Sequence, residues 1–290
     1  MSWVVWAEAA RPRTLGASVV PVVVGAASTG TLDPLRFAGT LVVALAFQVG
    51  VNYANDYFDA VKGVDTPERR GPRRLVAASV VQPRQMKRAA FAAFAVAVAA
   101  GSWLVLVAGW ALLVLGAASL IAALAYSGGP RPYGSAALGE LFVFVFFGVV
   151  ATVGSAYVQV EKFSALALMA SIPVGLLAVS LLIANNVRDI DTDKTTGKRT
   201  LPVKIGAKRS RRLFRLCIFL SYVWVPVVAL SGGGLPPLLA LVSSPAAAAP
   251  LKDIASEDPD GLIEALAGAA RLQIVFGLLL AGGLWLGTAK

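Results

Sequence analysis

Long apolar runs recur along the whole chain and exclude an ordinary water-soluble fold. The residues are 57% hydrophobic and only 14% charged, and the mean hydropathy is +0.74. A helix that crosses the hydrocarbon core of a bilayer needs about 20 mostly apolar residues. We therefore expect an all-α multi-pass membrane protein with about nine transmembrane helices in the lipid bilayer. The candidate spans are residues 15–32, 35–57, 88–108, 110–127, 137–158, 165–187, 213–231, 235–250 and 262–286.

The number of spans depends on the run 235–250, which is short and flanked by prolines. Without it, the chain would have eight spans instead of nine. Neither a low-complexity linker nor a long polar segment typical of a soluble domain separates the runs. We therefore expect residues 1–290 to form a single membrane-embedded domain.

The positions of Lys and Arg predict the orientation in the membrane. With a cytoplasmic N-terminus, the inner segments would be residues 1–14, 58–87, 128–136, 188–212 and 251–261. All Lys and Arg residues except Arg36, Lys162 and Lys290 lie in these segments or just inside the adjoining helix ends, as the positive-inside rule predicts. The first run resembles a signal peptide, but its removal would invert every later span, so we expect it to be retained. The high Ala, Val and Arg content is typical of a GC-rich bacterial genome, so we expect the plasma membrane of a bacterial cell.

Two short polar segments, residues 52–59 and 185–193, end the second and sixth spans. Ionisable side chains at membrane depth are costly and therefore functional candidates. Within each segment an Asn and two Asp recur at helical spacing, so each set lines one helical face. Their oxygens suit Mg²⁺, which takes hard ligands and keeps water and substrate phosphate in its shell. The six candidate ligands are Asn52, Asp56, Asp59, Asn185, Asp189 and Asp193.

A long basic loop follows each polar segment. Arg69, Arg70, Arg73 and Arg74 follow the first, whereas Lys194, Lys198, Arg199 and Lys204 follow the second. A solvated positive-inside loop is one interpretation. A basic loop follows both acid clusters, and this recurrence favours a second interpretation, a site for a bound anion. A diphosphate carries about three negative charges, which two metal ions and a few cations would neutralise.

The composition also excludes several kinds of chemistry. The chain has no His, and Cys217 is its one Cys, so imidazole catalysis and Cys or His metal clusters are excluded. The net charge of +10 is explained by topology and an anionic substrate; no nucleic-acid-binding motif accompanies it, so nucleic acid is not an expected partner. A secondary transporter is an alternative, because polar residues in broken membrane helices can bind ions. Clustering of the acids at one membrane face argues against it.

Several segments together resemble the UbiA superfamily of intramembrane prenyltransferases. Within it, the chain is most similar to the enzymes that prenylate 1,4-dihydroxy-2-naphthoate in menaquinone biosynthesis. The naphthoate assignment depends on residues 55–66 (NDYFDAVKGVDT) and 197–201 (GKRTL). The segments that carry the resemblance are residues 10–15, 55–59, 62–66, 126–130, 185–193 and 197–201.

The resemblance implies helices around a central cavity that opens laterally to the bilayer, and a Mg²⁺-dependent enzyme. The enzyme would transfer a polyprenyl group from a polyprenyl diphosphate to 1,4-dihydroxy-2-naphthoate, releasing CO₂ and diphosphate and giving demethylmenaquinone. Other aromatic acceptors, such as 4-hydroxybenzoate or homogentisate, are the alternative. Asp56, Asp59, Asp189 and Asp193 would hold Mg²⁺, with Asn52 and Asn185 as neutral ligands or orienting groups. The residues expected to bind diphosphate are Lys62, Arg188, Lys198 and Arg199.

Aromatic side chains near the acid clusters could shield an allylic cation by their π faces, or they could simply pack between helices. The candidates are Tyr53, Tyr57, Phe58 and Tyr126. Glu140 could cap a helix or contact the acceptor, and Asp191 could pair with Arg188 or Lys194.

Two positions depart from the family pattern. Gly63 stands where relatives have a further Asp, which leaves the role of Asp65 open, and Ser135 stands where they often have an aromatic residue.

Overall fold

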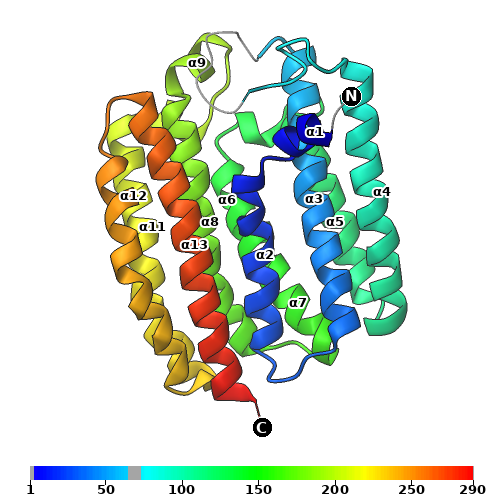
Figure 1. The fold of residues 1–290 in the computed structure, drawn as a ribbon, viewed down its shortest axis with the longest axis vertical. Coiled ribbons are helices and arrows are strands. Elements are labelled where there is room, and N and C mark those ends of the chain that lie inside the picture. The colour runs from blue at the N-terminus through cyan, green and yellow to red at the C-terminus, as the bar shows by residue number, and fades with distance from the viewer. Residues whose placement is uncertain (1–2, 65–72, 290) are drawn as a thin grey trace.

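The computed structural model describes residues 3–64 and 73–289, and every regular element within them is helical (Figure 1). The elements are α1 (Trp3–Ala10), α2 (Pro12–Ala27), α3 (Pro34–Val61), α4 (Pro83–Ala108), α5 (Ala111–Ser127), η1 (Tyr133–Ser135), α6 (Gly139–Val143), η2 (Phe144–Val150), α7 (Ala151–Val160), α8 (Ala165–Arg188), α9 (Ile190–Thr195), α10 (Leu201–Ile205), α11 (Ala207–Val228), η3 (Ala229–Gly233), η4 (Pro236–Ala247), α12 (Ala248–Asp253) and α13 (Pro259–Thr288).

The predicted all-α membrane fold is confirmed. Six segments in the described part of the chain are long and apolar enough to cross a bilayer: α3, α4, Gly139–Val160, α8, Ala207–Gly233 and α13. The apolar helices α2 and α5 are shorter, with 16 and 17 residues. The predicted span 235–250 forms η4, a 3₁₀ helix, and part of α12. Its prolines lack the backbone N–H groups that a regular α-helix needs.

N-terminal caps fix the starts of the two helices whose C-terminal ends carry the polar segments. The Asp33 carboxylate accepts hydrogen bonds from the backbone N–H groups of Leu35 and Arg36, at 2.9 and 3.0 Å, and so starts α3. The Ser164 hydroxyl accepts from the backbone of Ala167 and starts α8. Such caps satisfy N–H groups that have no partner inside the helix. Both helices then run to the end of the molecule where α1 and α9 lie (Figure 1), which brings the polar segments together.

Two hydrophobic clusters flank the middle of the molecule. One combines α2, α8, α11, η4 and α13 around the buried Phe214 and Phe276. The other combines α1, α3, α4 and residues 75–81 around Leu75, Met86 and Phe94. In Figure 1 helices α8, α11 and α13 of the first cluster lie on the left and α3 and α4 of the second lie on the right, with α2, α6 and α7 between them. The candidate site lies between the two clusters, so it is supported from both sides.

Arg36 ties together three connections at the end of the molecule opposite α9. Its guanidinium donates to the backbone carbonyls of Val107 (2.7 Å) and Val158 (3.0 Å). It also forms a 2.8 Å ion pair with Glu161. One side chain at the start of α3 is therefore joined to the last turns of α4 and α7 and to the residue that follows α7.

Candidate active site

A small polar cavity of about 70 Å³ lies where α3 and α8 end. Arg11, residues 126–135, the loop before α4, α9 and the loop after α9 contribute the rest of its wall. Its lining holds three acids, three cations and several neutral donors and acceptors. The lining residues are Arg11, Asn55, Asp59, Arg74, Tyr126, Ser127, Gly134, Ser135, Asn185, Asn186, Asp189, Asp193, Lys198 and Thr200.

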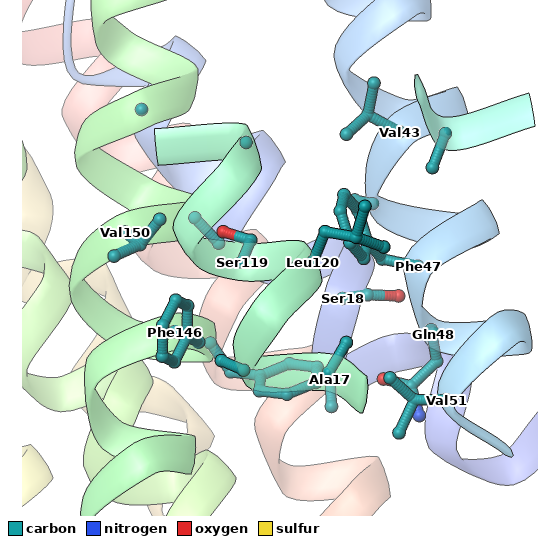
Figure 2. Close-up of a pocket in the computed structure, with 18 of the residues that line it drawn as sticks. Ala17, Ser18, Val43, Phe47, Gln48, Val51, Ser119, Leu120, Phe146 and Val150 are labelled. Atoms are coloured by element: carbon teal, nitrogen blue, oxygen red, sulfur yellow. The ribbon is translucent and has the colours of Figure 1, made fainter. Parts of the chain in front are cut away.

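A larger, mostly apolar cavity of about 560 Å³ adjoins the polar one. Figure 2 shows part of its wall, in which Phe47 and Val51 of α3 lie opposite Phe146 and Val150 of η2. Arg11, Asn55, Tyr126 and Asn185 line both cavities. The charged site therefore passes directly into an apolar space, an arrangement that suits a ligand with an anionic head and a hydrocarbon tail.

The acids of the first polar segment have different partners. Asp59 accepts from Arg74 at 3.2 Å and from Lys198 at 3.0 Å, so a residue of α3 meets both basic loops. Asp56 lies outside both cavities, and its carboxylate accepts from the backbone N–H groups of Leu75 (3.0 Å) and Val76 (3.2 Å). Asp56 therefore anchors the loop that carries Arg74.

The predicted ligand Asn52 also contacts backbone. Its amide donates to the carbonyl of Ala10 at 2.8 Å, at the junction between α1 and α2. The next residue, Arg11, has a left-handed backbone with φ 54°. A non-glycine residue at positive φ has a strained backbone, which persists only where the surrounding structure holds it. Here the Thr14 hydroxyl donates to the Arg11 carbonyl at 2.9 Å, and the Arg11 side chain lines both cavities.

The second polar segment is held by its own arginine. Arg188 donates to both carboxylate oxygens of Asp189, at 2.7 and 2.8 Å, and to the Asn185 amide oxygen at 2.9 Å. Asp193 accepts from the Thr200 hydroxyl at 3.3 Å. The structure thus brings Asp59, Asn185, Asp189 and Asp193 of the predicted ligands to the wall of one polar cavity.

The four predicted diphosphate-binding cations lie in different places. Lys198 lines the polar cavity. Arg188 does not line it, but forms an ion pair with Asp189, which does. Lys62 is exposed and donates to the backbone carbonyls of Ser127 and Gly129. Arg199 is exposed and lines neither cavity. Arg11 and Arg74 line the polar cavity, although sequence reasoning did not single them out from the other basic loop residues.

Of the predicted aromatic residues, Tyr126 alone lines a described cavity. Tyr53 donates to the Trp6 carbonyl at 2.9 Å and packs edge-on against the Trp6 ring. Tyr57 packs edge-on against Phe58, with ring centroids 5.1 Å apart. Both contacts belong to helix packing outside the cavities.

An aromatic row extends along the large cavity, and three of its four members were not predicted. It consists of Tyr126, Tyr133, Phe142 and Phe146, all of which line the cavity. Tyr126 meets Tyr133 edge-on at 5.4 Å, Tyr133 stacks on Phe142 at 4.0 Å, and Phe142 stacks on Phe146 at 6.0 Å between centroids. Burial raises the pKa of the Tyr133 phenol to about 12, so this hydroxyl stays neutral at physiological pH. Because Phe142 and Phe146 belong to an apolar run, the sequence could not distinguish them from lipid-facing residues.

The remaining sequence expectations concern three acids and one serine. Asp191 is exposed, and its carboxylate lies 3.9 Å from the Lys194 ammonium. Glu140 lies in the first turn of α6 and binds the Asn186 amide at 3.1 Å. Ser135 lines the polar cavity. Asp65 lies outside the described residues, as do Arg69 and Arg70.

The donors around the polar cavity fit a divalent cation that arrives with a phosphate ligand. Asp59, Asp189 and Asp193 supply carboxylate oxygens, each now held by Arg, Lys or Thr donors. Within the described residues, no group of three or more His, Cys, Asp or Glu could hold a metal ion unaided. Mg²⁺ commonly binds through one or two carboxylates and completes its shell with water and substrate phosphate. The site therefore fits Mg²⁺ provided that phosphate oxygens complete the shell.

Comparison with known proteins agrees with this geometry. The model of the UbiA prenyltransferase family matches residues 18–266. The chain is 37% identical to 1,4-dihydroxy-2-naphthoate octaprenyltransferase of Mycobacterium tuberculosis, covering 99% of this chain and 98% of that one. It is 30% identical to the protein of the same name in Bacillus subtilis, covering 98% and 93%.

Solved structures show the same fold. A UbiA homolog from Archaeoglobus fulgidus bound to DMAPP and Mg²⁺ superposes with a TM-score of 0.64 at 16% identity, covering 95% of this chain and 98% of that one. The apo structure of a UbiA homolog from Aeropyrum pernix superposes with a TM-score of 0.68 at 17% identity, covering 92% and 96%.

Proposed function

Because the chain belongs to the UbiA prenyltransferase family, we propose that it transfers a polyprenyl group from a polyprenyl diphosphate to 1,4-dihydroxy-2-naphthoate. CO₂ and diphosphate would be released, and the product would be the quinol form of demethylmenaquinone. The observation that carries the proposal is the similarity, over nearly the whole chain, to enzymes named for this acceptor. Menaquinone biosynthesis is the corresponding pathway.

The two adjoining cavities support this substrate class. The diphosphate would lie in the polar cavity, where Arg11, Arg74 and Lys198 offer positive charge. The polyprenyl tail would extend into the apolar cavity along Phe47, Phe146 and their neighbours (Figure 2). Charge-assisted hydrogen bonds to phosphate oxygens would fix the head, and burial of apolar surface would stabilise the tail.

Asp59, Asp189 and Asp193, with the neighbouring Asn185, are the residues we assign to Mg²⁺. A bound Mg²⁺ would neutralise charge that grows on the leaving diphosphate. Arg74 and Lys198 now neutralise Asp59. With the metal in place, these cations would be available to the diphosphate oxygens. Asp56 and Asn52 would act at one remove, by holding the backbone beside Arg74 and Arg11.

The bond changes follow from the substrates. The allylic C–O bond breaks, and its electron pair leaves with the diphosphate. The resulting allylic cation forms a C–C bond with the ring carbon that bears the carboxylate, and loss of CO₂ returns an electron pair to the ring. Tyr126 and the rest of the aromatic row would present π faces to the cation. The apolar wall would exclude water, which would otherwise trap the cation.

We infer that the polar cavity faces the cytoplasm of a bacterial cell. The described basic residues before α4 and after α8 lie at the same end of the molecule as the cavity, whereas Arg36 and Lys162 lie toward the opposite end. This distribution supports a cytoplasmic N-terminus through the positive-inside rule.

Product formation by the purified full-length protein in lipid nanodiscs tests the proposal. The reaction would contain a polyprenyl diphosphate, Mg²⁺ and equal amounts of 1,4-dihydroxy-2-naphthoate, 4-hydroxybenzoate and homogentisate. We expect a prenylated naphthalenediol, one CO₂ for each product molecule, and loss of activity on addition of EDTA. Prenylation of another acceptor alone would contradict the naphthoate assignment. Absence of any prenylated product or diphosphate release would contradict the enzyme assignment.

A further inference from the structure

A buried acid outside the two cavities contacts the polar site through one amide. Glu140 is 7% exposed and lies in the first turn of α6. Its Oε1 accepts from the Asn186 Nδ2 at 3.1 Å. Its Oε2 is buried and has no hydrogen-bond partner among the described residues. Asn186 itself is 8% exposed and lines the polar cavity.

This contact determines which way the Asn186 amide points. The Glu140 carboxylate accepts the N–H of Asn186, so the amide oxygen Oδ1 is turned away from Glu140. In the neighbouring Asn185 the amide oxygen, not the amide N–H, is used within the protein, because its Oδ1 accepts from Arg188. No described residue donates to the Asn186 Oδ1, and this atom is not among the buried atoms that lack a partner. Asn186 therefore offers the cavity a neutral hydrogen-bond acceptor.

The surroundings of Asn186 differ from those of the acids. The cations Arg74 and Lys198 contact Asp59, and Arg188 contacts Asp189. Asn186 instead contacts Glu140, on the same α6–η2 segment that carries Phe142 and Phe146 of the aromatic row. Tyr126, the member of the aromatic row that also lines the polar cavity, shares this cavity with Asn186. A neutral acceptor in a cavity that an aromatic ring also lines suits a flat aromatic ligand that donates a hydroxyl hydrogen.

We propose that Asn186 binds a ring hydroxyl of the aromatic acceptor through its amide oxygen, and that Glu140 is the positioning residue that holds this oxygen toward the cavity. The inference rests on the proposed function and adds to it a subsite for the acceptor. A site built to accept a hydrogen bond from a hydroxyl discriminates against an analogue that lacks it, since the acceptor atom is then left unpaired.

The first test compares Asn186→Leu with the wild type, using 1,4-dihydroxy-2-naphthoate and its two monohydroxy analogues. We expect the variant to raise KM for the dihydroxy acceptor about tenfold, as loss of one hydrogen bond implies. KM for the polyprenyl diphosphate and the Mg²⁺ dependence should stay unchanged. The wild type should discriminate against one monohydroxy analogue, and the variant should not. Unchanged discrimination, or an equal rise in both KM values, would overturn the subsite.

An exchange of the two partners tests the role of Glu140. Asn186→Asp would place two carboxylates together and should raise acceptor KM sharply. Adding Glu140→Gln restores a donor opposite the Asp, so E140Q/N186D should recover most of the loss. Glu140→Gln alone keeps an accepting oxygen and should resemble the wild type, whereas Glu140→Leu should resemble Asn186→Leu. No recovery in the double variant, or equal defects in Glu140→Gln and Glu140→Leu, would overturn the positioning role.

Gln273→Leu is the matched control. It removes another buried amide, on α13 and outside both cavities, and should leave the KM values for the acceptor and for the polyprenyl diphosphate unchanged. Because the double variant keeps the buried pair, the test holds even where a leucine variant folds poorly. A wild-type protein that prenylates no acceptor would overturn the proposed function. Normal wild-type turnover with unaltered Asn186→Leu kinetics would overturn the subsite alone.

Discussion

At the scale of single residues, Asp56 and Asp59 show that carboxylates on one helical face can have different roles. Asp59 faces the polar cavity and two cations, whereas Asp56 holds backbone N–H groups of the loop before α4. We expect Asp59→Asn to lower turnover at least about 100-fold and to raise the Mg²⁺ concentration needed for half-maximal rate. Asp56→Asn should leave the Mg²⁺ dependence unchanged and destabilise the protein by about 1–2 kcal/mol, since one charged hydrogen bond is lost. Mg²⁺ titrations and thermal unfolding of both variants check this. An equal rise in the Mg²⁺ requirement of both variants would contradict this distinction and indicate that Asp56 also binds the metal.

Lys198 and Lys62 form a second contrast between residues with the same charge. Lys198 pairs with Asp59 in the polar cavity, whereas Lys62 is exposed and donates to two backbone carbonyls. Lys198→Ala should raise KM for the polyprenyl diphosphate about tenfold or more, because a charge-assisted contact to phosphate is lost. Lys62→Ala serves as the control and should change this KM less than about threefold. Steady-state kinetics with varied polyprenyl diphosphate measure both KM values. A larger rise in KM for Lys62→Ala than for Lys198→Ala would indicate that the diphosphate binds near Lys62 instead.

At the scale of helices and loops, the Arg36 guanidinium joins the start of α3 to the ends of α4 and α7. Its removal would leave the carbonyls of Val107 and Val158 without their donor. Arg36→Leu should therefore destabilise the protein by about 2–3 kcal/mol, with little change in KM. Glu161 is about half exposed, so Glu161→Gln should cost less than about 1 kcal/mol. Thermal unfolding in nanodiscs measures both, and equal losses would show that the ion pair, not the carbonyl contacts, stabilises this end.

At the scale of the whole molecule, the sequence predicted the architecture better than the details of the site. Apolar runs located the six segments of the described chain that are long and apolar enough to cross a bilayer, because length and hydropathy are both read from the sequence. The count of about nine spans stays a prediction. The sequence put both polar segments at one membrane face because they end the second and sixth spans, and Asp59, Asp189 and Asp193 line one cavity in the structure. Asp193 lies on α9, after α8 has ended at Arg188. The partners of Asp56 and Asn52 could not be predicted, because Leu75, Val76 and Ala10 approach them only through tertiary folding. In the same way, neither Arg74 nor the Glu140–Asn186 contact has a local sequence signal.

The size of the apolar cavity should determine which polyprenyl chains the whole molecule accepts. Gly154 lines this cavity, and a Cβ there would meet no atom within 4 Å. A larger side chain would fill space that the distal part of a long tail needs. Gly154→Leu should therefore keep turnover of a short prenyl diphosphate and lower that of an octaprenyl diphosphate about tenfold, since several methylene groups would lose their buried position. Gly282→Leu is the matched control, because Gly282 is an exposed helical glycine of α13 with the same open surroundings. Competition between short and long diphosphates measures the ratio directly. An unchanged ratio in Gly154→Leu, or the same change in Gly282→Leu, would place the tail outside this cavity.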